Sequence, residues 1–141
     1  MSWIYNGAEI VTPPEEFVGF VYLITNLTNN RKYIGKKLLT FKKTRFKTIK
    51  LKNGKKKRQK IKGTTPSNWQ NYYGSSKELL LDIEKLGTEQ FKREILYFCK
   101  SKAECSYIEA KLQFEHKVLE SADYYNNYIM VRLHGSHIIK K

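Results

Sequence analysis

Two tyrosines and one glutamate are the side chains of this 141-residue chain whose types and positions could perform chemistry. Tyr22 ends the sequence Gly-Phe-Val-Tyr, and Tyr33 lies in Lys-Tyr-Ile-Gly. A phenol hydroxyl can position a water molecule or, as a phenolate, deprotonate it, although a free tyrosine with a pKa of about 10 is a poor base near neutrality. Glu109 offers a carboxylate that could bind a metal ion. Strand composition alone, however, favours two half-buried sheet tyrosines without a catalytic role.

The tyrosines lie on two short apolar runs that predict a β-hairpin. The runs Phe20–Thr25 and Lys32–Gly35 are rich in β-branched and aromatic residues, and the Asn-rich connection between them has the composition of a loop. If the loop holds an even number of residues, for example with Thr25 opposite Lys32, both tyrosines lie on the same face as diagonal neighbours. An odd loop would place them on opposite faces.

Glu109 lies on a helix predicted from Lys102 to about Leu119. A Ser-Lys-Ala-Glu capping box at 101–104 predicts its start. Two apolar stripes run along nearly opposite sides of this helix, so we expect it to be sandwiched between other elements. Glu109 shares the polar seam between the stripes with Gln113 and His116. A carboxylate at this edge would be partly buried and suited to a metal ion, whereas a lone helical glutamate is ordinarily a solvated surface residue.

The positive charge of the chain is concentrated in one segment. Lys and Arg number 27 against 13 Asp and Glu, a net charge of +14, and residues 36–62 hold 14 of the basic side chains. No acidic residue occurs from Phe17 to Lys77. Such a field favours a polyanion, and first of all nucleic acid, although charge runs also form solvated surfaces or disordered arms.

This basic segment is predicted to form a hairpin arm, because apolar residues interrupt it and because Asn-Gly at 53–54 is a strong hairpin signal. A two-residue type I′ turn there would place Lys52 opposite Lys55 and Lys50 opposite Lys57. Like charges directly opposite each other destabilise a ribbon, so the pattern predicts a counter-charge in the working state. A two-stranded ribbon fits the DNA major groove, and we expect the arm to lie along phosphates or to enter a groove.

Length and composition limit the remaining possibilities. The chain suffices for a single domain, residues 1–141, with one modest core. Cys99 and Cys105 are too few for a disulfide framework and lack the spacing of a zinc site, so free buried thiols are expected. No apolar run approaches the roughly 20 residues needed to cross a membrane, and the N-terminus lacks the pattern of a signal peptide. We expect an intracellular protein without membrane contact.

The two tyrosine segments resemble the signature of the GIY-YIG nucleases, with Val21 in place of the first isoleucine. Asn68–Ser76 and Tyr107–Ala110 also look like phage-encoded homing endonucleases of this family, so the resemblance covers roughly residues 17–129. It implies an α+β fold in which a small, mainly antiparallel central sheet is flanked by helices. The basic β-hairpin arm, at about residues 38–62, would be an insertion in this fold.

The resemblance also implies an activity, which is metal-dependent hydrolysis of phosphodiester bonds in double-stranded DNA, with a homing-type role as one option. Tyr22 and Tyr33 would act on the attacking water, with Lys36 and Lys37 expected to stabilise a phenolate. Glu109 would hold Mg²⁺, or another divalent metal such as Mn²⁺.

Two further positions follow from the resemblance. The family has an Arg on a helix shortly after the second motif, where this chain has the basic hairpin. Arg45 and Arg58 are the candidates, of which Arg45 is nearer to the motif, and nearby lysines could substitute in part. The family's Asn corresponds to Asn126 or Asn127.

DNA-binding side chains are expected mainly in the basic segment and at two later positions. They are Lys36, Lys37, Lys42, Lys43, Lys47, Lys50, Lys55, Lys56, Lys57, Arg58, Lys60, Trp69 and Asn126.

Two other classes of protein compete with an endonuclease. A non-catalytic basic nucleic-acid-binding domain would explain the charge, with Trp69 stacking on bases, but it would not explain Glu109 or the motif. An interaction domain that merely keeps the fold predicts neither DNA binding nor a metal site. Because the chain leaves little room for a separate recognition domain, target recognition could come from the arm, a homodimer or a specificity partner. If the chain is phage-encoded, it would act in the cytoplasm of the host cell.

Overall fold

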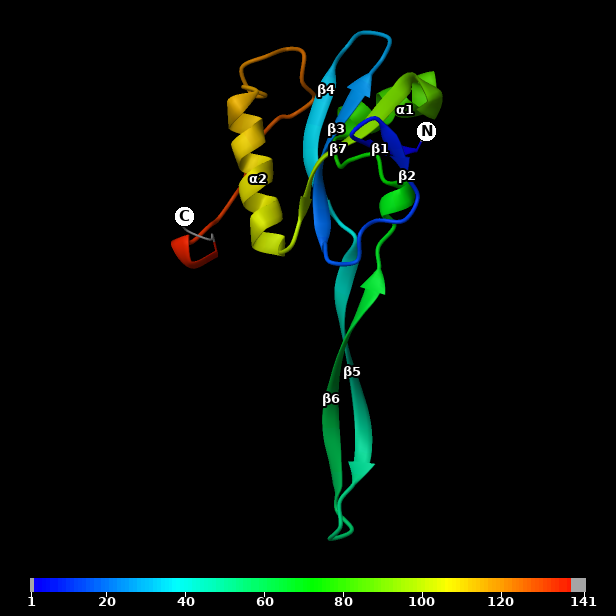
Figure 1. Cartoon of the computed structure of the whole chain (residues 1–141), viewed down its shortest axis with the longest axis vertical. Coiled ribbons are helices and arrows are strands. Elements are labelled where there is room, and N and C mark those ends of the chain that lie inside the picture. Colours follow the sequence, from blue (N-terminus) through cyan, green and yellow to red (C-terminus); the bar gives the residue numbers. More distant parts are fainter. Residues whose placement is uncertain (1, 138–141) are drawn as a thin grey trace.

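The computed structural model of the chain describes residues 2–137 and contains a five-stranded sheet in the order β2-β1-β7-β3-β4 (Figure 1). The strands are β1 (Trp3–Tyr5), β2 (Ala8–Ile10), β3 (Gly19–Asn26), β4 (Lys32–Leu38) and β7 (Phe91–Cys99). β1 is parallel to β7, and the other neighbouring pairs are antiparallel. The α+β class is therefore confirmed, with a mixed sheet.

Two helices cover opposite faces of this sheet. α1 (Lys77–Leu86) packs Leu79 and Ile83 into a core that includes Tyr22, and α2 (Lys102–Glu115) packs Cys105 into a second core (Figure 1). β3 supplies both cores because its side chains alternate, with Tyr22 on the α1 face and Val21 on the α2 face. Both cysteines of the chain are free and buried, as expected.

Both helices begin at the serines that cap them. The Ser76 side chain accepts from the backbone N–H of Leu79, and Ser101 accepts from that of Glu104. The short 3₁₀ helices are η1 (Trp69–Asn71), η2 (Thr88–Gln90) and η3 (Gly135–His137). Within residues 2–137, no helix is long and apolar enough to cross a membrane.

α2 differs from its prediction in length and in surroundings. It ends at Glu115 rather than near Leu119, and soon afterwards Lys117 adopts a left-handed φ of 53°. The expectation of a sandwiched helix was wrong, because Tyr107 and Phe114 of the second apolar stripe are exposed. α2 therefore covers one face of the sheet with its first stripe only.

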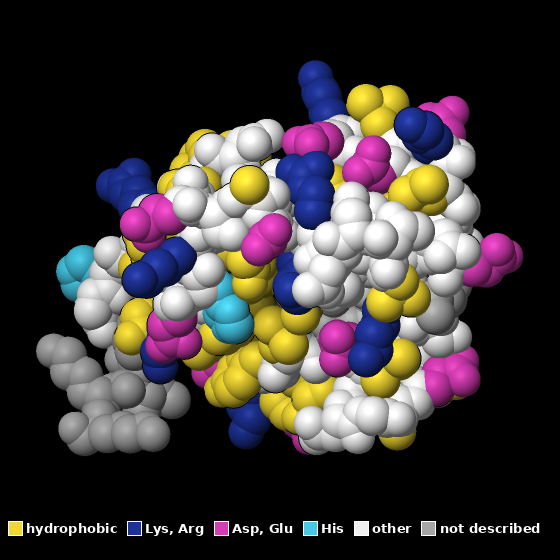
Figure 2. Space-filling view, turned by 90° about the horizontal axis from the view of Figure 1, so that it is seen from above, with side chains coloured by type: hydrophobic (Ala, Val, Ile, Leu, Met, Phe, Trp, Pro, Cys, Tyr) yellow, Lys and Arg dark blue, Asp and Glu magenta, His cyan; other side chains and the backbone are white. Residues whose placement is uncertain are grey.

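The basic segment forms the expected hairpin arm as a separate two-stranded sheet that projects from the domain (Figure 1). It consists of β5 (Thr40–Lys50) and β6 (Lys56–Pro66), so it reaches further along the chain than the 38–62 expected. The opposite end of the domain carries interspersed basic and acidic side chains (Figure 2). The unbalanced positive charge is therefore concentrated on the arm, whose paired strands hold no acidic residue.

The register of the arm differs by one residue from the prediction. Leu51 and Lys55 close a three-residue turn, and Lys50 faces Lys56 rather than Lys57. Only Gly54 of the Asn-Gly pair has a positive φ, 81°, so the turn has one left-handed residue instead of the two of a type I′ turn. This register places most cations opposite Thr, Gln, Ile or Phe and leaves one directly opposed pair of like charges, which reduces the predicted repulsion.

Candidate active site

The two tyrosines lie on the same face of the hairpin formed by β3 and β4. Thr25 faces Lys32, so the loop is even, and Tyr22 faces Gly35 while Ile24 faces Tyr33. The tyrosine rings are diagonal neighbours, with centroids 6.2 Å apart. The geometric condition predicted from strand alternation is confirmed.

Two glycines make room for these rings. Gly35 lies beneath the Tyr22 ring, where an added Cβ would lie 2.6 Å from Tyr22 Cζ and would also clash with the hydroxyl. Gly74 has a φ of +92°, and an added Cβ there would lie 3.2 Å from Tyr33 Cε1. The glycine of Tyr-Ile-Gly is therefore required by the tyrosine of Gly-Phe-Val-Tyr, which explains why the two halves of the motif occur together.

Replacing Gly35 with Ala should destabilise the fold by roughly 1–3 kcal/mol, because the methyl group overpacks against a ring that is completely buried. Thermal unfolding would measure the loss. The matched control is Gly63→Ala in the arm, where the nearest atom to an added Cβ is 4.0 Å away. Equal melting temperatures for the two variants would contradict this role of Gly35.

Glu109 approaches the tyrosines from α2, which lies next to the edge strand β4. Its half-buried carboxylate accepts the backbone N–H of Lys36, the residue directly after the Tyr-Ile-Gly motif. Burial raises the pKa of Glu109, and the charge and N–H of Lys36 oppose this rise. The negative charge of Glu109 in turn raises the pKa of both Tyr22 and Tyr33, which are more strongly affected by their own burial. Glu109 therefore lies within electrostatic range of both tyrosines.

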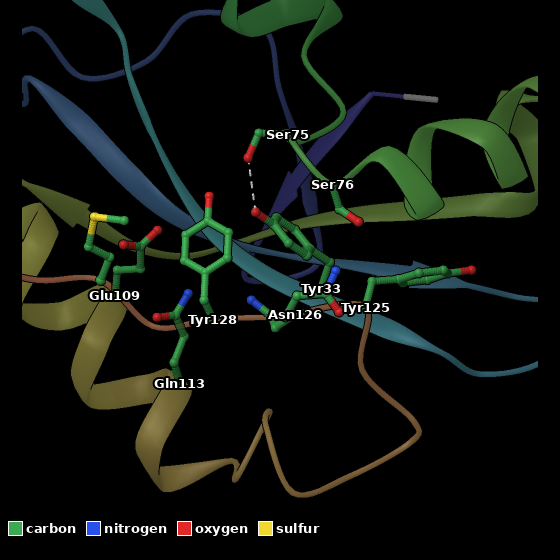
Figure 3. A pocket seen from close by; sticks show the side chains of 10 residues that line it. Tyr33, Ser75, Ser76, Glu109, Gln113, Tyr125, Asn126 and Tyr128 are labelled. Atoms are coloured by element: carbon green, nitrogen blue, oxygen red, sulfur yellow. Dashed lines mark hydrogen bonds between the residues drawn. The ribbon is translucent and has the colours of Figure 1, made fainter.

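Tyr33 and Glu109 line one cavity of about 170 Å³ (Figure 3). Its walls come from β4, the segment before α1, α2 and the segment that follows α2. The other lining residues are Ser75, Ser76, Gln113, Tyr125, Asn126, Asn127, Tyr128 and Met130. Side chains from four separate parts of the sequence thus converge on one polar hollow.

The outer edge of β4 is held by side chains that also line this cavity. Asn126 accepts from the Ile34 N–H at 3.1 Å and donates to the Ile34 carbonyl at 2.9 Å, as a neighbouring strand would. Gln113 donates to the same carbonyl at 3.0 Å. Because Asn126 is buried and its amide is engaged on both sides, its place in the structure fits positioning of Tyr33 rather than contact with DNA.

The two tyrosines differ in their access to the cavity. Tyr22 is 1% exposed, whereas Tyr33 lines the cavity and its hydroxyl lies 3.1 Å from the Ser75 hydroxyl. The expected phenolate stabilised by lysines is not supported, because burial raises the pKa of both tyrosines. Lys36 donates to Ser106, and Lys37 lies over the Tyr72 ring, 4.2 Å from its centroid. Both tyrosines are therefore neutral phenols near pH 7.

The buried Tyr22 should make the fold sensitive to alkali. Burial holds the pKa of Tyr22 well above its ordinary value of 10, so the folded state keeps a proton that the unfolded state loses above about pH 10. The contribution of the buried phenol to the free energy of unfolding is fully present below pH 10. The free energy of unfolding should fall as the pH rises beyond 10. Tyr22→Phe should show a smaller fall between pH 9 and 11 in thermal unfolding. An unchanged fall in that variant would assign the effect to other groups.

A tyrosine pair near a half-buried glutamate, at the edge of a small sheet, is the arrangement that the family resemblance implies. The chain matches a family model described as "Putative endonuclease segE, GIY-YIG domain" over residues 3–129. The chain belongs to this GIY-YIG family. The matched span contains β1, the whole arm, both tyrosines, Glu109 and Asn126. Neither the curated proteins nor the solved structures searched contain a match. GIY-YIG membership implies a nuclease function and DNA as the substrate.

Arg45 does not lie at the GIY-YIG cavity. It projects from the arm opposite Ile61 and lines a separate hollow with Lys43, and none of the cavity-lining residues within the described chain is Arg or Lys. The cation whose charge acts on the glutamate is Lys36, which follows the motif directly. The expectation that Arg45 joins the catalytic group therefore lacks support from the structure.

Trp69 is a core residue, which corrects the expectation that it contacts DNA. Its side chain is 5% exposed and packs edge-to-face on Phe20, while its carbonyl accepts from the Trp3 indole at 2.7 Å. The ring is therefore not available to stack on a base. Trp69 belongs to the segment 69–74, in which Tyr72 lies against Tyr22.

The site suits a metal ion held mainly by its substrate. Within residues 2–137, no three His, Cys, Asp or Glu side chains gather as a metal cage. Mg²⁺ often binds one or two carboxylates and completes its coordination with water and phosphate oxygens. A single carboxylate beside a polar cavity fits this mode, so Glu109 is compatible with the metal that the motif implies.

Sequence reasoning did not assign six of the cavity-lining residues to the site, namely Ser75, Ser76, Gln113, Tyr125, Tyr128 and Met130. Gln113 was detectable, since it lies one helical turn after Glu109 in the same polar seam. Ser75 precedes the serine that caps α1, so Ser75 itself is available to Tyr33. Tyr128 follows α2, and no helical or strand pattern in the sequence indicates that it lines the cavity.

Proposed function

We propose that the chain is a metal-dependent GIY-YIG endonuclease that hydrolyses phosphodiester bonds in double-stranded DNA. The observation that carries this proposal is the convergence of Tyr33 and Glu109 on one polar cavity, although 75 residues separate them. A domain that only bound nucleic acid would have no need for a half-buried carboxylate beside the motif.

Tyr33 is the tyrosine that would meet the reacting groups. Its hydroxyl lines the cavity beside Ser75, and because the phenol is neutral it can donate a hydrogen bond to the attacking water or to a phosphate oxygen. Tyr22 lies beneath it, fully buried, and supports the position of the Tyr33 ring. In this assignment the first tyrosine of the motif is structural and the second is chemical.

Glu109 would hold a divalent cation, Mg²⁺ or Mn²⁺. When bound, such a cation polarises a phosphate oxygen and neutralises the charge that develops on it. Glu109 suits this task because burial destabilises its charged form, and a nearby positive charge offsets that cost. The Lys36 N–H fixes the direction of the carboxylate relative to the motif.

Lys36 is the proposed replacement for the arginine of the GIY-YIG pattern. Its charge already acts on Glu109, and its ammonium group is anchored by Ser106 on α2. A lysine binds phosphate as a point charge, whereas arginine forms a bidentate fork, so the substitution changes how the scissile phosphate is held. The basic arm would supply most of the remaining phosphate contacts, through the exposed lysines expected from the sequence.

A plasmid assay separates an endonuclease from a DNA-binding domain. Supercoiled plasmid should be converted to nicked or linear DNA with Mg²⁺ or Mn²⁺ and should stay intact with EDTA. Retarded migration of intact plasmid under all conditions would instead support the non-catalytic binder. A homing-type role requires sequence-specific recognition in addition, and the arm is the element of this chain available for it.

A further inference from the structure

The arm has the length and shape to follow one turn of a DNA groove. Each strand has 11 residues, which at about 3.3 Å per residue gives roughly 36 Å, close to one turn of B-DNA. The two strands twist around each other along this length (Figure 1), as two-stranded ribbons do. Such a ribbon fits the width of the major groove.

The two faces of the arm differ in chemistry. Every residue pair in the register has the same parity, so even-numbered side chains lie on one face and odd-numbered ones on the other. The odd face contains three apolar side chains, Phe41, Ile49 and Ile61, and four cations. The even face contains six cations, which are Lys42, Lys50, Lys56, Arg58, Lys60 and Lys62. The even face also carries Thr44 and Thr48, whose hydroxyls can bond base edges or phosphates.

One side chain of the even face is held in place before any ligand binds. The Arg58 guanidinium lies over the ring of Phe46, with Cζ 3.9 Å from the centroid. Phe46 is 55% exposed and belongs to neither core of the domain, so packing of the domain does not explain it. The stack orients the guanidinium and reduces the conformational freedom that Arg58 would lose on binding. Arg is the side chain that most often reads guanine, through two bonds to O6 and N7.

We propose that the even face of the arm enters the major groove and that Arg58 reads a guanine about one helical turn from the cleaved phosphate. This inference rests on the proposed function, which it extends from cleavage to target selection. Arg58 is beside Thr48, which lies 13 residues after Gly35 along β4 and β5. The two strands follow one another along the long axis (Figure 1). The separation is therefore at most about 43 Å, or at most about 13 base pairs.

The test is a binding selection that does not need cleavage. Glu109→Gln protein would select from a 40-base-pair duplex library, and the enriched sequences should contain a guanine at one fixed position. Adding Arg58→Ala or Arg58→Lys should reduce that preference by about tenfold or more. Arg45→Ala is the matched control, because it removes the same charge from the opposite face and should leave the preference unchanged.

Cleavage mapping on the selected duplex gives the distance. With active protein, the guanine should lie at one fixed distance of no more than about 13 base pairs from the cut. No fixed guanine, or equal loss of preference in the Arg58 and Arg45 variants, would overturn the inference while leaving the nuclease function intact. Conversely, a selected guanine without any cutting would support base reading and contradict the proposed function.

Discussion

Glu109→Gln should lower the rate of metal-dependent DNA cleavage by at least about a hundredfold while the protein stays folded and bound to DNA. A metal ligand contributes several kcal/mol of transition-state stabilisation, and each 1.4 kcal/mol corresponds to a factor of ten in rate. Gln keeps an oxygen that can accept the Lys36 N–H, so the variant removes the charge and leaves the local geometry. Single-turnover plasmid cleavage and DNA-binding anisotropy would measure the two effects separately.

The control for this variant is Glu115→Gln, which removes an exposed carboxylate from the end of the same helix. It should cut at the rate of the unaltered chain. Thermal unfolding gives a second measure that does not depend on activity, since Mg²⁺ should raise the melting temperature of the unaltered protein more than that of Glu109→Gln. Cleavage by Glu109→Gln at the original rate would contradict the role proposed for this carboxylate.

Local patterns were sufficient to predict the elements that carry the site. Strand alternation predicted that Tyr22 and Tyr33 share a face if the loop is even, as it is, and the capping sequence located the first turn of the helix that carries Glu109. These predictions succeeded because they depend on backbone periods and on hydrogen bonds within a few residues. The pairing of Glu109 with the tyrosines depends on how α2 lies along β4. Only the resemblance to GIY-YIG nucleases indicated that arrangement in advance.

The features that were not predicted depend on long-range packing or on a balance of small energies. The residues around Trp69 in the sequence are equally compatible with a buried ring and with an exposed ring that stacks on bases. Only its contacts with Phe20 and Trp3 make it a core residue. In the arm, Asn-Gly occurs in both two- and three-residue turns. The observed turn sets a register that avoids most contacts between like charges. The repulsion energy that this register avoids is summed over the whole ribbon, so the residues of the turn alone do not reveal it.

The site also explains why a lysine could serve where GIY-YIG proteins have a helical arginine. Here the chain leaves β4 directly into β5, so no helix follows the motif to carry that arginine. Lys36 is part of β4 itself and lies on the same side as α2, where it reaches Ser106 and acts on Glu109. The insertion that gives the protein its arm therefore replaces the helix that would carry the arginine, and Lys36 is the cation whose charge acts on Glu109.

Shortening the arm should weaken DNA binding and strongly reduce its dependence on salt. Removing residues 45–50 and 56–61 keeps the native turn at 51–55 and joins it to the pair Thr44 and Lys62, so the alternation of side chains is preserved. The change removes seven Lys and Arg side chains. If each of them except the base-reading Arg58 contacts one phosphate, the slope of log K against log salt should decrease by about 5, since each contact contributes about 0.9.

A full-length variant with the same seven side chains changed to Gln separates charge from length. Both variants should show the same reduction in salt dependence, because the released counterions come from the charges and not from the length of the ribbon. The cleavage step on DNA that is already bound should change little, since the arm residues removed lie outside the cavity of Tyr33 and Glu109. Weaker binding with an unchanged salt slope would show that the arm acts through shape or apolar contacts, and phosphate contact would then have to come from lysines on the domain.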